Sequence, residues 1–163
     1  MGKEPAPISH PAGAASTATE SGQPVFHCKL APIRLGEFDI GTVLYHGRYF
    51  HLLEEIRENF LRTVGLPYPE LVRSSLHLAV TESRQNFHAP IGYGDEVEAN
   101  LRFNQVRRTS FNAIYELFVL ARSPKPVHQA ETKHVCVSVD SARGFRVTHL
   151  PEKLLEELKR FTV

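Results

Sequence analysis

The chain has 163 residues, of which 42% are hydrophobic and 23% are charged, and its formal net charge is +1. This length and balance fit one globular domain with a substantial core, and a nearly neutral chain has no overall attraction to nucleic acid or to an anionic membrane. The two cysteines, Cys28 and Cys136, have no metal-ligand spacing, and there is no CxxC or HExxH motif. We therefore expect no zinc site, no disulfide framework, no membrane span and a reducing, cytoplasmic location.

The first 24 residues differ from the rest, because they are mostly Pro, Ala, Ser, Thr and Gly with almost no large apolar side chains. Such a segment cannot bury enough surface to offset the entropy lost on ordering. It also lacks the apolar central stretch of a secretory signal. We expect a disordered tail over residues 1–24 and one domain over residues 25–163.

Hydrophobic periodicity predicts the elements of this domain. Residues 25–35 alternate like a strand, with Pro32 marking an edge or a bulge. From Tyr49 the apolar residues recur at helical spacing until Gly65, which is expected to cap the helix. Four more strands and a short amphipathic helix should follow, at 76–90, 97–106, 110–120, 128–140 and 150–161. One dominant helix with a run of antiparallel strands predicts an α+β domain, with the helix lying across one face of a curved sheet.

A single acid stands out in the segment "FDIGTVLYHGRY", where Asp39 occupies a small-residue turn just before the long helix. An acid in this place could bond its own backbone and close the turn. It could equally act in chemistry at the start of the helix. The residues alone leave both interpretations open.

Three segments together resemble a known family. These are "FDIGTVLYHGRY", "PIGYGDEV" with Pro90, Gly94 and Asp95, and "RRTSF". In this order and spacing they resemble the hotdog-fold acyl-CoA thioesterases, in particular the 4-hydroxybenzoyl-CoA thioesterase and tol-pal-associated acyl-CoA thioesterase family. The resemblance covers roughly residues 26–160 and implies a curved antiparallel sheet wrapped around one central helix. Glu37 replaces the first acid of the family's Asp-x-Asp, and "IGT" replaces the usual "AGG" or "AAG", which puts the size of the substrate in question.

The resemblance implies an enzyme that hydrolyses acyl-CoA thioesters to the free acid and CoA. Asp39 would attack the thioester carbonyl or activate a water molecule. Backbone N–H groups of His46 and Gly47, at the start of the helix, would stabilise the oxyanion. The His46 side chain would either pack structurally or contact the substrate.

Further residues are candidates for substrate binding. Tyr45 and Tyr49 lie close to the turn in sequence, although Tyr49 also begins the apolar stripe of the helix and is expected to pack in the core. By resemblance, Arg107, Arg108 and Ser110 would contact the phosphates of coenzyme A, and the alternative is a solvated basic turn.

Four other titratable residues receive mainly structural interpretations. Asp95 should form a turn, and His77 and His88 should be structural, although one of them could contact an acyl chain. Thioesterases of another subclass use a glutamate on the helix as nucleophile, which makes Glu54 a minor candidate.

The family also implies assembly, because relatives pair two sheets edge to edge as homodimers or homotetramers with the active site at the dimer interface. No cofactor is expected, since coenzyme A is part of the substrate. The acyl group is open, and the thiol carrier is either coenzyme A or an acyl carrier protein. The alternative function is a non-catalytic hotdog protein that binds acyl-CoA or acyl carrier protein. A hotdog dehydratase ranks last, because its catalytic histidine and partner acid are not found.

Overall fold

The computed structural model describes residues 15–18, 24–140 and 144–163. In chain order the elements are β1 (Ala15–Ala18), β2 (Pro24–Lys29), the 3-10 turns η1 (Leu35–Glu37) and η2 (His46–Arg48), α1 (Tyr49–Thr63), α2 (Tyr68–Arg73), β3 (Leu76–Phe87), β4 (Glu98–Asn104), β5 (Ser110–Phe118), β6 (His128–Asp140), β7 (Gly144–Val147) and α3 (Glu152–Arg160).

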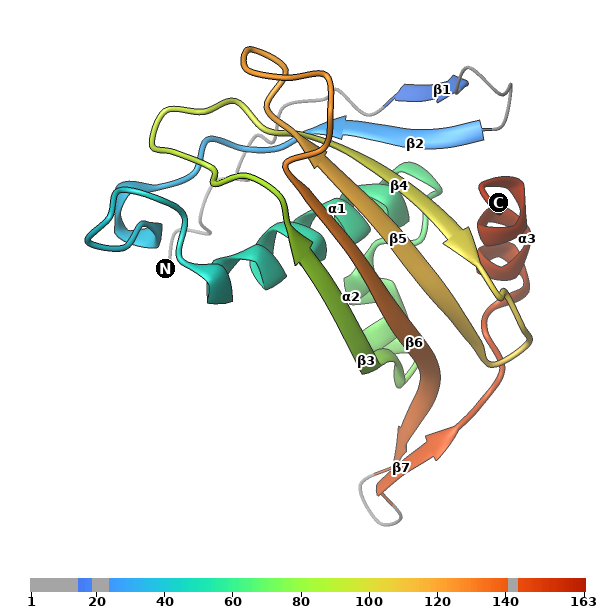
Figure 1. Ribbon diagram of the computed structural model, residues 1–163. Coiled ribbons are helices and arrows are strands. Elements are labelled where there is room, and N and C mark those ends of the chain that lie inside the picture. The colour runs from blue at the N-terminus through green and yellow to red at the C-terminus, as the bar shows by residue number, and fades with distance from the viewer. Residues whose placement is uncertain (1–14, 19–23, 141–143) are drawn as a thin grey trace, which may run out of the picture.

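All described strands belong to one antiparallel sheet in the order β1-β2-β4-β5-β6-β3, and β7 pairs with the end of β6. Figure 1 shows α1 lying across one face of this curved sheet, while β7 and the end of β6 extend beyond it. Among the described strands, β3 pairs with β6 alone. Within residues 15–18, 24–140 and 144–163, the opposite edge of this 12-residue strand is therefore unpaired.

The core lies between α1 and the inner face of the sheet. Because side chains alternate between the faces of a strand, every second residue of β4 and β5 is buried there, including Leu101, Phe103 and Tyr115. Helix α1 contributes Ile56 and Phe60 from its apolar stripe. The long helix and its burial in the sheet are thus as predicted.

The end of α1 is also as predicted. Gly65 adopts φ +70°, a left-handed conformation that favours glycine, and its N–H donates to the Arg62 carbonyl. The Leu66 N–H reaches back to the Leu61 carbonyl at 2.8 Å, which satisfies another carbonyl of the last turn.

The first strand is shorter than its predicted range of 25–35. After Lys29, the Ala31 N–H donates to the Glu55 carboxylate of α1 at 2.9 Å instead of to a neighbouring strand, and Pro32 has no N–H to offer. Within the predicted tail, Ala15–Ala18 form β1 against β2, and Pro24 begins β2. Residues 1–14 and 19–23 lie outside the described residues, and the division into a disordered tail and one domain stays a prediction. Helix α2 and strand β7 were not predicted.

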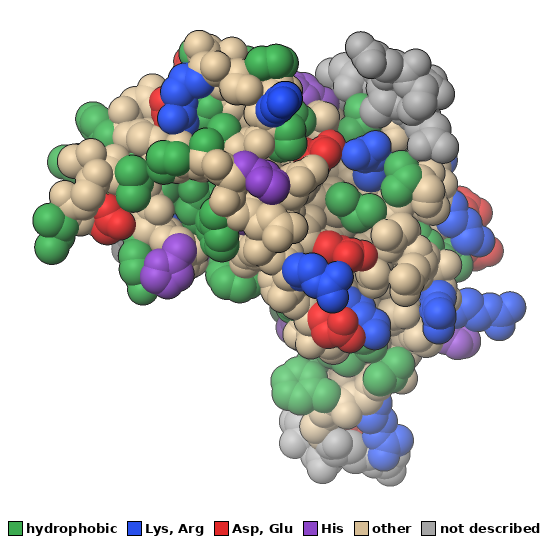
Figure 2. Space-filling view, viewed as in Figure 1, with side chains coloured by type: hydrophobic (Ala, Val, Ile, Leu, Met, Phe, Trp, Pro, Cys, Tyr) green, Lys and Arg blue, Asp and Glu red, His purple; other side chains and the backbone are tan. Residues whose placement is uncertain are grey.

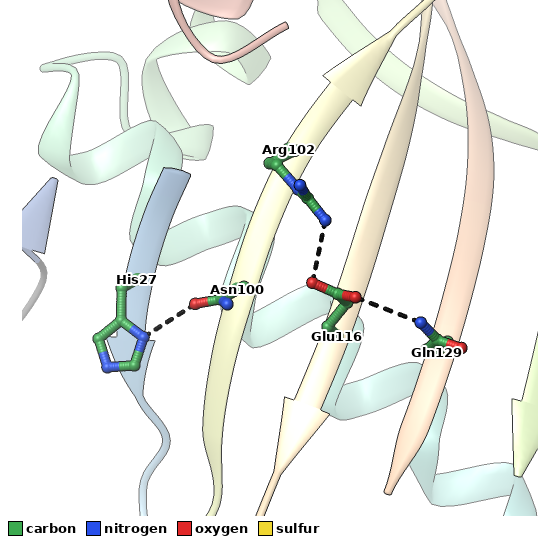
Figure 3. Close-up of polar contacts among 5 residues, drawn as sticks. All are labelled: His27, Asn100, Arg102, Glu116 and Gln129. Atoms are coloured by element: carbon green, nitrogen blue, oxygen red, sulfur yellow. Dashed lines mark hydrogen bonds and ion pairs between the residues drawn. The ribbon is translucent and has the colours of Figure 1, made fainter. Parts of the chain in front are cut away.

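The outer face of the sheet carries two groups of hydrogen-bonded polar side chains that together span four strands (Figure 3). His27 Nδ1 lies 3.0 Å from Asn100 Oδ1. Arg102 Nη2 donates to Glu116 Oε2 at 3.0 Å, and Gln129 Nε2 donates to the other oxygen of Glu116 at 3.2 Å. Hydrogen bonds among these side chains therefore hold neighbouring strands in register on the face that α1 does not cover.

Candidate active site

Asp39 lies in a tight turn that is closed by its own hydrogen bonds. Its Oδ1 accepts from the N–H groups of Gly41 at 2.8 Å and Val43 at 3.4 Å. Its backbone N–H donates to the Val43 carbonyl at 3.0 Å, and its carbonyl accepts from Thr42 at 3.0 Å. Asp39 is exposed, and none of the described residues bonds to Oδ2. The turn geometry therefore occupies one carboxylate oxygen and leaves the other open.

The start of the long helix offers free donors. Residues His46–Arg48 form a 3-10 turn that leads into α1. Within the described part of the chain, the N–H groups of His46 and Gly47 donate to no backbone or side-chain acceptor. A Cβ on Gly47 would lie 2.9 Å from Cε1 of Tyr45, so glycine lets the Tyr45 ring lie close to this backbone. The two free amides point to an anion-stabilising site at the helix start.

A hollow of about 290 Å³ opens beside these donors. It lies between the start of α1 and the end of β3, the strand with the unpaired edge. Its lining residues are Leu44, His46, Tyr49, Phe87, His88, Ala89 and Pro90. The structure thus brings His46 and Tyr49 to one cavity, together with His88. Asp39 is not among the lining residues, although Val43 and Leu44 connect its turn to the cavity wall.

The back of this hollow is aromatic. Tyr49 is buried and packs edge-on against Phe87, with ring centroids 4.9 Å apart. Its ring is tilted by 39° against that of His128, with centroids 4.5 Å apart. Burial raises the pKa of the Tyr49 hydroxyl above its usual value. His128 Nε2 lies 3.0 Å from Gln85 Oε1, and burial, helped by His88, lowers the pKa of His128 to about 4. A neutral imidazole therefore stands behind Tyr49, and sequence reasoning missed it.

Arg107 and Arg108 lie at the other end of the sheet, in the β4–β5 connection, and Ser110 is the first residue of β5. The Arg107 N–H donates to the Ser110 carbonyl at 2.8 Å, and both arginine side chains are exposed. Ser110 pairs with Val135, whereas Leu117 pairs with His128 behind the hollow. At strand spacing, the length of β5 between these two points is roughly 23 Å. Within a single protomer, the residues predicted to bind the phosphates of coenzyme A therefore do not lie at the hollow.

Hydrophobic side chains gather on the surface around the Asp39 turn. Figure 2 shows them on the left of the molecule, over the loops that lie there in Figure 1. Ile40, next to Asp39, is fully exposed, and Leu35 and Tyr93 are largely exposed. Apolar groups around an open acid favour a ligand with an apolar part.

A chain of polar side chains is buried between α1 and the sheet. Thr132 Oγ1 donates to the Tyr115 hydroxyl oxygen at 3.3 Å and lies 2.7 Å from His134 Nε2. His134 stacks on Phe111, and burial, with a further contribution from the Arg57 charge, lowers its pKa to about 3. Arg57 is itself buried, and its nearest carboxylate, Glu54, is 3.6 Å away. Glu54 is thus engaged with Arg57 in the middle of the helix.

Comparison with known proteins identifies the family. Residues 33–158 match the model of the thioesterase-like superfamily. The chain belongs to this superfamily. The matched range begins just before the Asp39 turn and ends in α3, so it includes the turn, the helix start and the hollow.

Two curated relatives of this thioesterase-like protein span most of its domain. A protein from Aquifex aeolicus, named provisionally as an esterase, is 28% identical over 127 residues, which is 78% of this chain and 93% of the relative. The 1,4-dihydroxy-2-naphthoyl-CoA hydrolase of Crocosphaera subtropica is 26% identical over 107 residues, 65% of this chain and 78% of the relative. These similarities support the superfamily and leave the narrower 4-hydroxybenzoyl-CoA and tol-pal assignment a prediction.

The crystal structure of a hypothetical protein from Aquifex aeolicus superimposes with a TM-score of 0.70 at 26% identity, covering 82% of this chain and 98% of the other. Together with the superfamily match, this similarity confirms the predicted hotdog fold, an α+β arrangement of an antiparallel sheet, one long helix and a short C-terminal helix.

Two further structural observations concern metals and membranes. Within residues 15–18, 24–140 and 144–163, no three His, Cys, Asp or Glu side chains lie close enough together to hold a metal ion. In the same ranges, no helix has the length and apolar character needed to cross a membrane. The cytoplasmic location stays a prediction.

Proposed function

We propose that this thioesterase-like protein hydrolyses acyl-CoA thioesters to the free acid and CoA. The observation that carries the proposal is the pair of free N–H groups at His46 and Gly47, which lie where α1 begins and beside a hollow. Membership of the superfamily supports the reaction type. The name of the Crocosphaera relative supports a CoA thioester as the substrate class.

The chemistry needs a donor pair and an acid. As the carbonyl carbon becomes tetrahedral, its oxygen gains negative charge, and preorganised N–H groups at His46 and Gly47 would stabilise this charge by about 3 kcal/mol each. Asp39 would either form an acyl anhydride, which water then hydrolyses, or remove a proton from the attacking water. In both routes the carbon–sulfur bond breaks, and the thiolate of CoA takes up a proton.

One observation favours the non-catalytic alternative. Asp39 bonds its own turn through Oδ1 and does not line the hollow. An acid with this geometry would suit a protein that only binds acyl-CoA or acyl carrier protein. In the catalytic proposal, the thioester must therefore lie between the open Oδ2 of Asp39 and the amides of His46 and Gly47.

We further propose that the active protein is at least a homodimer joined through β3. An unpaired edge of 12 residues offers N–H and C=O groups to another strand, and pairing with a second copy would satisfy them. Two-fold antiparallel pairing would place the Phe87 end of one β3 beside the Leu76 end of the other. This geometry does not distinguish a dimer from a tetramer built of two dimers.

Such a dimer would also give Arg107 and Arg108 a role. They lie at the Leu76 end of the sheet, and the hollow lies at the Phe87 end. In an antiparallel pair, the β4–β5 connection of one copy would therefore lie on the same side as the hollow of its partner. We propose that these arginines, with Ser110, contact the phosphates of a CoA thioester bound mainly by the other subunit.

The test is a thiol-trapping assay on a panel of acyl-CoA thioesters with aromatic, short and long acyl groups. Asp39→Asn should lower turnover on the best substrate by at least about 10²-fold, the scale of losing a general base. The matched control is Glu37→Gln, which neutralises the other acid of the same loop and should leave turnover within about twofold, because it keeps the size of the side chain and leaves the Asp39 carboxylate in place.

Two outcomes would contradict the proposal. If the wild-type protein binds acyl-CoA but releases no thiol from any thioester, the non-catalytic function is correct. If the protein is active and Asp39→Asn keeps full turnover, the hydrolysis stands but another group performs it.

A further inference from the structure

The segment Pro90–Asp95 is held at both ends by one arginine. Arg122 comes from the β5–β6 connection, and its Nη2 donates to the Asp95 carboxylate at 2.5 Å and to the Pro90 carbonyl at 2.7 Å. Asp95 Oδ2 also accepts from the Gly92 N–H at 2.6 Å. Asp95 therefore forms the turn that the sequence predicts, and Arg122 fixes this turn to a connection 27 residues further along the chain.

The fixed segment is in direct contact with the turn that carries Asp39. The Leu44 N–H donates to the Ile91 carbonyl at 2.8 Å, and Val43 and Gly92 form a β-bridge. Val43 is also the residue whose carbonyl accepts from the Asp39 N–H and whose own N–H reaches Asp39 Oδ1. Arg122 is thus linked to the Asp39 turn by its bonds to Pro90 and Asp95, by the Leu44–Ile91 hydrogen bond and by the Val43–Gly92 bridge.

The same segment reaches the hollow. Pro90, which accepts from Arg122, is one of its lining residues. Tyr49 is another, and the positive charge of Arg122 opposes, as a smaller effect, the rise in the pKa of Tyr49 that burial causes. The Arg122 side chain is about two-fifths exposed and that of Asp95 one-fifth exposed. A pair this exposed contributes only about 0–1 kcal/mol to folding.

We propose that Arg122 and Asp95 are positioning residues for Asp39, an inference that rests on the proposed hydrolysis. The Arg122 guanidinium, whose Nη2 donates to Pro90 and Asp95, holds the 90–95 segment against Val43. Val43, together with Gly41, sets the direction of the Asp39 carboxylate. Displacing a reacting group by about 1 Å can cost about 10²-fold in rate. The pair therefore matters far more for turnover than for stability.

The test compares two arginines that form exposed ion pairs. Arg122→Ala should lower kcat by about tenfold, part of the cost of misplacing a reacting group, with KM nearly unchanged. Arg122→Lys, which keeps one donor to Asp95, should recover part of the loss. The control is Arg160→Ala, which breaks the 2.8 Å pair with Glu157 on α3 and should leave kcat unchanged. The midpoint temperature of thermal unfolding should change by a similar amount in both alanine variants.

Two readouts isolate positioning from a general loss of structure. In the Asp39→Asn background, Arg122→Ala should cause no further fall in the residual kcat, because it acts through the same carboxylate. Hydrogen–deuterium exchange should accelerate in the peptide that contains Val43 and Leu44 in Arg122→Ala, and should not change in Arg160→Ala.

The outcomes are separable. An inactive wild type, or full activity in Asp39→Asn, would overturn the proposed roles of both Asp39 and Arg122. A large effect of Asp39→Asn, combined with an unchanged kcat in Arg122→Ala or with additive losses in the double variant, would overturn the positioning role alone. Unchanged exchange at Val43 and Leu44 would do the same.

Discussion

Stability should fall on mild acidification because two histidines are buried in their neutral form. His134 and His128 are both fully buried, and their pKa values are lowered from 6.5 to about 3 and about 4, respectively. Below pH 6.5 the unfolded chain therefore binds protons that the folded protein does not. The stabilisation is fully present above this pH and is lost as the pH falls toward 4 and 3.

The magnitude follows from the size of the shifts. Between pH 7.5 and pH 5, a histidine that stays neutral when folded costs about 2 kcal/mol of unfolding free energy, at 1.36 kcal/mol per pH unit below 6.5. His134, enclosed under α1, should contribute this full amount. His128 is also buried, and its folded pKa of about 4 keeps it neutral at pH 5, so it should contribute about 2 kcal/mol as well. The two together give a loss of about 4 kcal/mol.

Urea unfolding followed by circular dichroism would measure this loss, because the chain has no tryptophan for fluorescence. His134→Gln should reduce the difference between pH 7.5 and pH 5 by about 2 kcal/mol, whatever its absolute stability. His51→Gln, an exposed change on α1, should leave the difference as in the wild type. If His134→Gln shows the wild-type difference, the buried histidine is not the source of the acid sensitivity.

Two further predictions concern the core and the coenzyme. Phe60→Ala should cost about 3–5 kcal/mol of unfolding free energy, because Phe60 is 1% exposed and packs among other aromatic rings. Phe50→Ala, on the half-exposed side of the same helix, should cost less than about 1 kcal/mol, and equal costs in urea unfolding would contradict the placement of the core. Changing Arg107 and Arg108 to Ala should raise KM for an acyl-CoA but not for a short pantetheine thioester, and steady-state kinetics with equal effects on both would exclude a phosphate contact.

Much of the fold could be predicted because the spacing of hydrophobic residues along the sequence shows which residues are buried. The helical spacing from Tyr49 and the alternation around Leu101 reflect a helix and a sheet that share one core, so α1 and strands β3 to β6 were found within a few residues. β7 escaped prediction because its four residues are all exposed and carry no inward-facing pattern, even at Phe145 and Val147.

The site was less predictable, because it depends on contacts between distant segments. Motif spacing located Asp39 and the helix start, but nothing near His128 in the sequence indicates that it packs behind Tyr49. The pairing of Arg122 with Asp95 likewise depends on two loops meeting in space. The resemblance implies that Arg107 and Arg108 contact the coenzyme, but within one protomer they lie a strand length from the hollow, a separation that motif order does not reveal.

The bonded polar side chains on the outer face of the sheet make this face an unfavourable surface for binding another protein. His27 is bonded to Asn100, and Glu116 is bonded to Arg102 and Gln129, across the strands. A protein covering this face would strip water from charged groups without offering them better partners, which is unfavourable. We therefore expect contact with other molecules on the helix side and at the open edge of β3, where the apolar loops and unpaired backbone groups lie.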